Sequence, residues 1–164
     1  MVKVLCIDPG RHSAWLVGTY SDIEDPEIFS LHCAQKSYAD VYQAFYEHGL
    51  EMAKDIEHII YEEPFVRSHK AARMQYGMIG IIYLIASHTP TCRAVWPVHP
   101  SWIKRTATGK GNATKEEMIE SAHNYCEKNP TLRKQIISSD TADAFWIYRY
   151  FIENHSLRDF ENEE

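Results

Sequence analysis

Two short apolar runs, each closed by an acidic residue and a proline, constrain this chain of 164 residues more than any other feature. The first is Val-Leu-Cys-Ile-Asp-Pro-Gly, with its acid at Asp8, and the second is Ile-Ile-Tyr-Glu-Glu-Pro, with Glu62 and Glu63. Runs of this length and composition indicate buried strands. A carboxylate at the end of a buried strand is uncommon unless a positive charge meets it there. We therefore expect both strand ends to lie at a cation-binding site.

The remaining pattern alternates between strand-like and helix-like segments. Strands are predicted at 3–7, 14–20, 27–33, 56–61 and 92–96, and helices at 38–53, 68–87, 101–106, 115–126 and 140–154. Their order predicts an α/β fold, a mixed five-stranded sheet flanked by helices, in which Asp8 and Glu62 end neighbouring parallel strands. We expect one domain, residues 1–156, and a short acidic tail, 157–164. Gly77 and Gly80 favour close packing, either on the sheet or in a dimer interface.

A second pair of acids stands at the start of the last predicted helix. Asp140 and Asp143 are three residues apart, so both carboxylates lie on one face of the first turn. An acidic helix start is ordinary by itself, because the helix dipole favours it. Added to the strand-end acids, however, the pair completes four carboxylates that repel one another unless cations neutralise them. One or two Mg²⁺ or Mn²⁺ ions, about 4 Å apart, would do so and would bind a scissile phosphate.

Only one of Glu62 and Glu63 is expected to reach such ions, because consecutive strand residues face opposite sides of a sheet. The strand is apolar on both faces, so its pattern does not decide between them. The candidate metal ligands are accordingly Asp8, Glu62, Asp140 and Asp143, with Glu63 as a solvent-facing residue or a backup ligand.

The charge distribution indicates a polyanionic partner although the net charge is -6. Between Pro64 and Lys115 there are eight Lys or Arg and no Asp or Glu, whereas the remainder of the chain is strongly acidic. A charge block of this kind is either a solvated face or a surface that holds a phosphate backbone. Under the second interpretation we expect nucleic-acid contacts from Arg67, Lys70, Arg73, Lys104, Arg105 and Lys110.

Several other classes of protein are excluded or disfavoured. The four cysteines are scattered without the spacing of a zinc site or a disulfide framework. The longest apolar stretch, 78–86, is too short to span a bilayer, and no signal-peptide pattern precedes the first strand. We therefore expect a soluble, cytoplasmic protein. Gly109-Lys110-Gly111 lacks the spacing of a nucleotide-binding loop, so no nucleotide cofactor is expected. The chain is also too short for the two lobes of an actin-like ATPase.

The motifs together resemble those of RuvC-type Holliday junction resolvases, which belong to the ribonuclease H-like nuclease superfamily. The resemblance spans nearly the whole chain, and the compact length and acidic surroundings are similar to phage or viral members, for which the cytoplasm is that of the host. The matching pieces occur in the family's order: 7–10, 62–65, 103–115 and 140–144.

The resemblance implies a ribonuclease H-like fold and a homodimer that nicks two strands of a four-way DNA junction symmetrically. Carried over by position, Asp8, Glu62, Asp140 and Asp143 are the catalytic metal ligands. Lys115 matches a lysine near the scissile phosphate, where an exposed, indifferent lysine is the alternative. Phe65 matches an aromatic residue that stacks at the open junction centre, where a core phenylalanine is the alternative.

The sequence thus predicts a structure-specific DNA endonuclease of recombination and repair that resolves four-way junctions and leaves 5′-phosphate ends. Two alternatives remain open at this stage. One keeps the fold and the metals but acts on flap DNA, an RNA–DNA hybrid or structured RNA. The other is a junction-binding scaffold without catalysis, in which the acids are structural.

Overall fold

The computed structural model describes residues 2–20, 22–33, 37–65 and 69–155, with the side chains of 22–25 and 69–72 excepted. Its centre is a five-stranded sheet in the order β3-β2-β1-β4-β5. The strands are β1 (Lys3–Asp8), β2 (His12–Thr19), β3 (Asp22–His32), β4 (His58–Glu62) and β5 (Ala94–Val98). β1, β2 and β3 pair antiparallel, whereas β4 lies parallel to both β1 and β5. The predicted mixed five-stranded sheet is confirmed.

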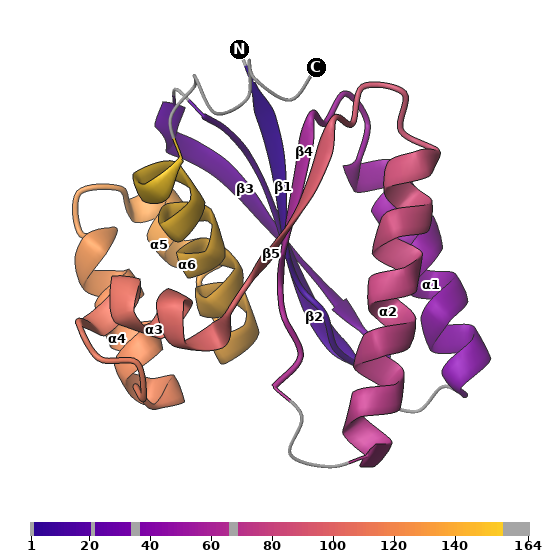
Figure 1. The fold of residues 1–164 in the computed structure, drawn as a ribbon. Helices are drawn as coiled ribbons and strands as arrows, with labels where there is room; N and C mark the ends of the chain where they lie inside the picture. Colours follow the sequence, from indigo (N-terminus) through magenta and orange to yellow (C-terminus); the bar gives the residue numbers. More distant parts are fainter. Residues whose placement is uncertain (1, 21, 34–36, 66–68, 156–164) are drawn as a thin grey trace.

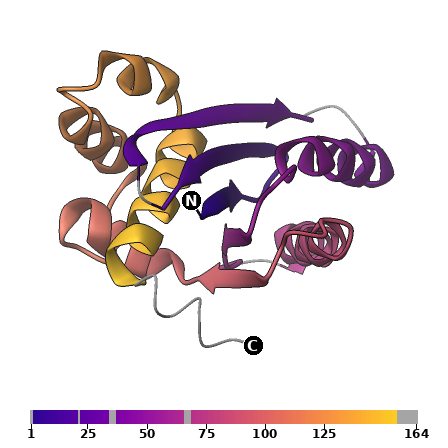
Figure 2. The ribbon, with the colours of Figure 1, turned by 90° about the horizontal axis from the view of Figure 1, so that it is seen from above.

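Helices cover both faces of this sheet (Figures 1 and 2). One face carries α1 (Tyr38–Met52) and α2 (His69–Ser87). The other carries α3 (Pro100–Thr108), α4 (Lys115–Tyr125), α5 (Pro130–Gln135) and α6 (Ser139–Asn154). Two apolar cores result, one on each side of the sheet. None of the helices in the described part of the chain has the length and hydropathy that a membrane span requires.

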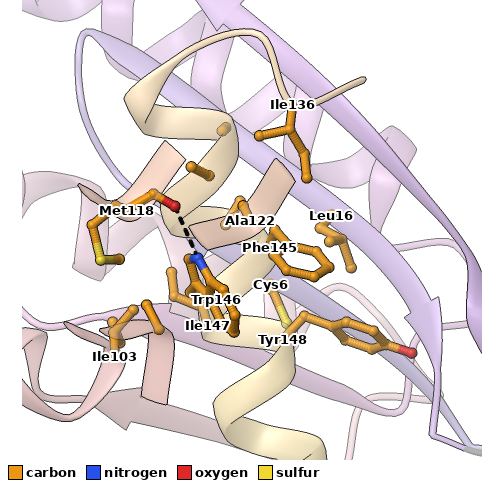
Figure 3. Packing of buried hydrophobic residues seen from close by; sticks show 14 of the residues in the cluster. Cys6, Leu16, Ile103, Met118, Ala122, Ile136, Phe145, Trp146, Ile147 and Tyr148 are labelled. Atoms are coloured by element: carbon orange, nitrogen blue, oxygen red, sulfur yellow. Dashed lines mark hydrogen bonds between the residues drawn. The ribbon is translucent and has the colours of Figure 1, made fainter. Parts of the chain in front are cut away.

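Helix α6 is the central element of the second core. It is buried on almost all sides, and it packs against β1 and β2 below it and against α3 and α4 beside it. Trp146 donates its indole N–H to the Met118 carbonyl at 3.2 Å, a contact visible in Figure 3, and Tyr148 donates its hydroxyl to the Thr19 carbonyl at 2.7 Å. These bonds satisfy the polar atoms of two large buried rings. They fix the helix so that its first turn lies at the edge of the sheet where β1 ends.

The helices predicted to start at 115 and 140 are found, and each has a local N-cap. Thr114 accepts from the Glu117 backbone N–H at 3.2 Å, and the Glu117 carboxylate accepts from the Thr114 N–H at 2.8 Å, which is a complete capping box. At α6 the N-cap is Ser138, whose hydroxyl accepts from the Thr141 backbone N–H at 3.2 Å. Local sequence therefore sets the first turn of the two helices that carry Lys115, Asp140 and Asp143.

Three sequence-based expectations about elements were wrong. The short helix α5 was not predicted, although Asn129 caps it and Pro130 occupies its first turn. Strand β5 was expected to end before Pro97 but continues through Pro97 to Val98. Strand β3 likewise includes Pro26, which was expected to precede it. Both strands are at the edges of the sheet, where a proline can leave its missing N–H on the unpaired side.

The two glycines of α2 have different surroundings. A Cβ on Gly77 would lie 2.3 Å from the Tyr42 hydroxyl, so Gly77 allows close packing of α2 on α1. A Cβ on Gly80 would have no heavy atom within 4 Å. Close packing within the chain therefore explains Gly77 and leaves Gly80 without such a role. The acidic tail, 157–164, lies outside the described residues.

Candidate active site

Three elements bring the four candidate acids to one edge of the sheet. Asp8 is the last residue of β1 and Glu62 is the last residue of β4. Because these strands run parallel with Ile7 opposite Tyr61, the two carboxylates leave the sheet at the same level. Asp140 comes from the first turn of α6 and Asp143 from the start of the next turn, and α6 packs across β1 and β2.

The alternation of side chains along each strand decides which face the acids share. Cys6 and Ile60 are buried beneath α6, so Asp8 and Glu62, two residues further along, also face α6. Tyr61 belongs to the opposite core, which puts Glu63 on the side away from α6. Glu62, and not Glu63, therefore lines the cavity described next, which settles the geometric question that the apolar strand left open.

The four acids line a single cavity of about 360 Å³. All four are partly exposed at its surface. Its wall combines acidic, basic and neutral polar side chains with backbone from the turn after β1. The lining residues are Asp8, Pro9, Gly10, His12, Glu62, Gln75, Pro100, Ile103, Lys104, Ala113, Lys115, Met118, Asp140 and Asp143.

Burial, and then mutual repulsion, disfavour the charged forms of three of the carboxylates. Burial is the main cause that raises the pKa of Asp8 well above its ordinary value, and the three neighbouring acids raise it further. Burial, and then Asp143, raise the pKa of Glu62 to about 8. Burial, and then Asp140, raise the pKa of Asp143 to about 6. A group of acids held together in this way is costly to ionise without positive charge nearby.

Two lysines of the cavity provide part of that positive charge. Lys104 of α3 lowers the pKa of Glu62, and Lys115, the first residue of α4, lowers that of Asp8. Both lysines lower the pKa of Asp143. Even with these contributions the three pKa values stay raised, so the lysines compensate the acids only in part.

The donor set of the cavity fits a hard divalent cation. Its four carboxylates supply only oxygen ligands, which Mg²⁺ and Mn²⁺ prefer, and a cation would offset the burial and the repulsion that raise the pKa values of Asp8, Glu62 and Asp143. Within the described residues, no three His, Cys, Asp or Glu side chains are grouped tightly enough to hold an ion as they stand. Binding would accordingly require these carboxylates to rotate towards a common point.

The predicted nucleic-acid residues are distributed around this cavity rather than gathered in it. Lys104 lines the cavity, whereas Arg105 faces a separate groove with Trp102 and Tyr150. Lys110 forms an exposed ion pair with Glu117, with Nζ and Oε1 3.5 Å apart.

The remaining predicted contacts lie just after β4, on α2 or outside the described residues. Arg73 is exposed on α2. Phe65, just beyond β4, is 61% exposed, so it is not a core phenylalanine. Arg67 and the side chain of Lys70 lie outside the described residues.

Sequence reasoning missed two polar residues of the cavity, His12 and Gln75. Strand alternation brings His12 to the cavity, because it lies two residues before Ala14, which pairs with Asp8; this register, and the start of β2 at His12, are not marked in the sequence. Gln75 reaches the cavity from α2, and no local pattern marks it. His99 caps α3: its Nδ1 accepts from the Ser101 backbone N–H at 3.2 Å.

Solved structures with a similar fold match this chain over most of its length. The chain is similar to Thermus thermophilus RuvC, with a TM-score of 0.64, 19% identity, and coverage of 93% of this chain and 96% of that one. It is also similar to T. thermophilus RuvC in complex with a Holliday junction substrate (0.65, 18%, 92% and 94%). The yeast mitochondrial Holliday junction resolvase Ydc2 matches with a TM-score of 0.56, 11% identity, and coverage of 97% and 82%. Neither a protein-family model nor a curated protein sequence matches the chain.

The mixed sheet and its flanking helices therefore define a ribonuclease H-like fold. Within that class the chain has the RuvC-type arrangement over nearly its whole length. At these identities the likeness concerns the fold, and the chemistry has to be argued from the cavity itself.

Proposed function

We propose that this protein is a divalent-metal-dependent endonuclease that resolves four-way DNA junctions. The observation that carries the proposal is the convergence of four carboxylates and two lysines in one cavity at the carboxyl edge of parallel strands. Such a set suits an ion-assisted attack on a phosphate and has little use in a purely structural site. The resolvase titles of the similar structures support the choice of substrate.

In this proposal Asp8, Glu62, Asp140 and Asp143 hold one or two Mg²⁺ or Mn²⁺ ions. When bound, the ions activate the attacking water and stabilise the leaving 3′ oxygen, so that the products are a 5′ phosphate and a 3′ hydroxyl. Lys104 and Lys115 bind the non-bridging oxygens of the phosphate, since each projects an ammonium group into the cavity wall. The same lysines lower the pKa values of Glu62 and Asp143, which favours the ionised form that binds a cation.

The DNA arms would extend from the cavity over the basic residues between Pro64 and Lys115. Arg67, Lys70, Arg73, Arg105 and Lys110 are the proposed backbone contacts, and such contacts contribute affinity without reading sequence. Phe65 stacks on an unpaired base at the junction centre, a role consistent with its 61% exposure beside the cavity strand.

Paired nicks require two sites, and we propose a homodimer formed through the outer face of α2. Tyr76, Gly80, Tyr83 and Leu84 share that face at helical spacing, and the three larger residues are 57%, 50% and 45% exposed. Exposed aromatic and leucine side chains around an open glycine provide a surface on which a second copy of the helix can pack closely.

A junction-cleavage assay tests the proposed function. Purified protein is incubated with a labelled immobile four-way junction, with and without Mg²⁺ or Mn²⁺, and the nick positions are mapped. We expect symmetric nicks that depend on the cation. Asp8→Asn and Asp143→Asn should bind the junction but lose nicking, by at least about 100-fold, because each removes a ligand charge.

Parallel reactions on flap DNA and an RNA–DNA hybrid separate the proposed substrate from the alternatives. Faster cutting of either one would reassign the substrate and keep the nuclease chemistry. Junctions that stay bound but uncut across titrations of both cations would contradict the enzyme and favour the scaffold.

A further inference from the structure

His12 lines the same cavity as the four acids, and the proposed mechanism gives it no role. It is the first residue of β2, two positions before Ala14, which pairs with Asp8. Since side chains alternate along a strand, His12 projects from the same face of the sheet as Asp8. The strand order puts β2 and β4 on opposite sides of β1. His12 therefore stands on the flank of Asp8 away from Glu62 and its partner Lys104.

The imidazole of His12 is held by a second histidine. His12 and His32 are opposite each other in the pairing of β2 with β3, and their Nδ1 atoms are 2.9 Å apart. The ring centroids are 5.2 Å apart with the planes tilted by 56°. The ladder continues past the pair, because the Cys33 backbone N–H donates to the Arg11 carbonyl at 2.9 Å. The backbone on both sides of the two rings is thus fixed.

The contact between the two Nδ1 atoms restricts the protons of His12. One nitrogen must donate and the other must accept, so Nδ1 of His12 is fully used by His32. Nε2 is the remaining polar atom of the ring and the one available to a group in the cavity. A phosphate oxygen can only accept a hydrogen bond, so Nε2 has to carry a proton to bind it. In neutral His12 this requires Nδ1 to be the acceptor and the Nδ1–H of His32 to be the donor.

We propose that His12 donates its Nε2–H to a non-bridging oxygen of the phosphate bound in the cavity, and that His32 is a positioning residue which selects the required tautomer. The inference rests on the proposed nuclease function and adds a substrate contact to it. Lys104 and His12 then bind the phosphate group from opposite flanks of Asp8.

The test uses side chains that keep or remove one donor at a time. His12→Phe preserves the ring shape without a donor and should slow single-turnover junction nicking roughly 10- to 100-fold, the usual effect of losing a hydrogen bond to a charged group. His12→Gln puts an amide N–H near the position of Nε2 and should recover most of the rate. His32→Phe should slow nicking roughly tenfold, and His32→Asn, whose amide N–H replaces Nδ1–H, should restore it.

The double variant His12→Phe/His32→Phe distinguishes positioning from an independent role. If His32 acts through His12, the double variant nicks at the rate of His12→Phe alone, because the second change has nothing left to orient. His88→Phe is the matched control: His88 is an exposed histidine whose Nδ1 lies 2.8 Å from the Tyr46 hydroxyl at the far end of α2, and its loss should leave the rate unchanged.

The outcomes separate this inference from the function on which it rests. Wild-type protein that nicks, together with His12→Phe at the wild-type rate, overturns the role of His12 and leaves the nuclease assignment intact. Additive effects of the His12 and His32 changes overturn the positioning role. Wild-type protein that never nicks overturns both proposals. Both histidines are exposed, so far-UV circular dichroism should show that every variant folds.

Discussion

Single lysines differ in what they can do for the acidic cavity. Lys115 is exposed and stands in the first turn of α4, where the helix dipole disfavours a positive charge. Its position is explained by the acids, because it lowers the pKa of both Asp8 and Asp143. Lys104 is more enclosed and acts on Glu62 and Asp143. Each lysine therefore compensates a different strand-end acid, and both act on the same helix acid.

Lys104→Met should therefore slow nicking and move its pH dependence. Without the ammonium group, the pKa values of Glu62 and Asp143 rise further above their ordinary range. Cations must then compete with protons up to a higher pH, so the acidic limb of the pH–rate profile shifts to higher pH. We expect a rate loss of about 100-fold from the missing phosphate contact. Single-turnover nicking measured across pH checks both effects.

Lys54→Met serves as the control, since Lys54 is an exposed lysine outside the cavity and should change neither the rate nor the profile. An acidic limb that stays in place in Lys104→Met would contradict the electrostatic role of Lys104, even if the rate falls.

At the scale of helices and strands, local chemistry made some features predictable and left others hidden. The capping box at Thr114 and the hydrophobic strands ending at Asp8 and Glu62 are encoded within a few residues. The continuation of β5 through Pro97 is not, because it depends on β5 lying at the edge of the sheet. The pairing of His12 with His32 was also hidden, since it requires the register of two strands and not the composition of either.

The two glycines of α2 are a matched pair for testing how tightly each position packs within one chain. Gly77→Ala should destabilise the fold by roughly 1 to 3 kcal/mol, because its Cβ would meet the Tyr42 hydroxyl at 2.3 Å. Gly80→Ala should stabilise the monomer by about 0.5 to 1 kcal/mol, since the site is open and alanine favours a helix. Urea unfolding at a protein concentration that keeps the chain monomeric gives both values.

Gly80→Arg then tests the interface without disturbing the chain itself. The site is open, so the arginine is accommodated in the monomer, but its length and charge would separate two copies of α2. We expect a dimer in the wild type and a monomer in the variant by sedimentation velocity, with junction nicks that are no longer paired. A variant that remains dimeric would move the interface to another surface.

For the whole molecule, the buried acids of the candidate site lower the free energy of unfolding near neutral pH, whereas the two apolar cores raise it. A carboxyl whose pKa is raised on folding binds its proton more tightly in the folded state than in the unfolded state. The free energy of unfolding therefore falls as the pH rises and this proton is lost. Glu62 follows this rule, with its pKa raised from 4.5 to about 8. Its contribution favours the folded state fully below pH 4.5 and is lost progressively as the pH rises towards 8. The apolar packing around α6 and α2 on the two faces of the sheet offsets that cost.

Glu62→Gln should accordingly be more stable than the wild type near neutral pH, by on the order of 1 to 3 kcal/mol, and the difference should vanish below pH 4.5. Mg²⁺ should reverse the order, because a cation that binds only the folded, ionised site stabilises the wild type by mass action. Glu63→Gln, which removes the neighbouring carboxylate outside the cavity, should show neither effect. Urea denaturation across pH, with and without Mg²⁺, measures all three proteins. Equal Mg²⁺ stabilisation of the wild type and Glu62→Gln would exclude Glu62 from the metal ligands, whatever the nuclease assay shows.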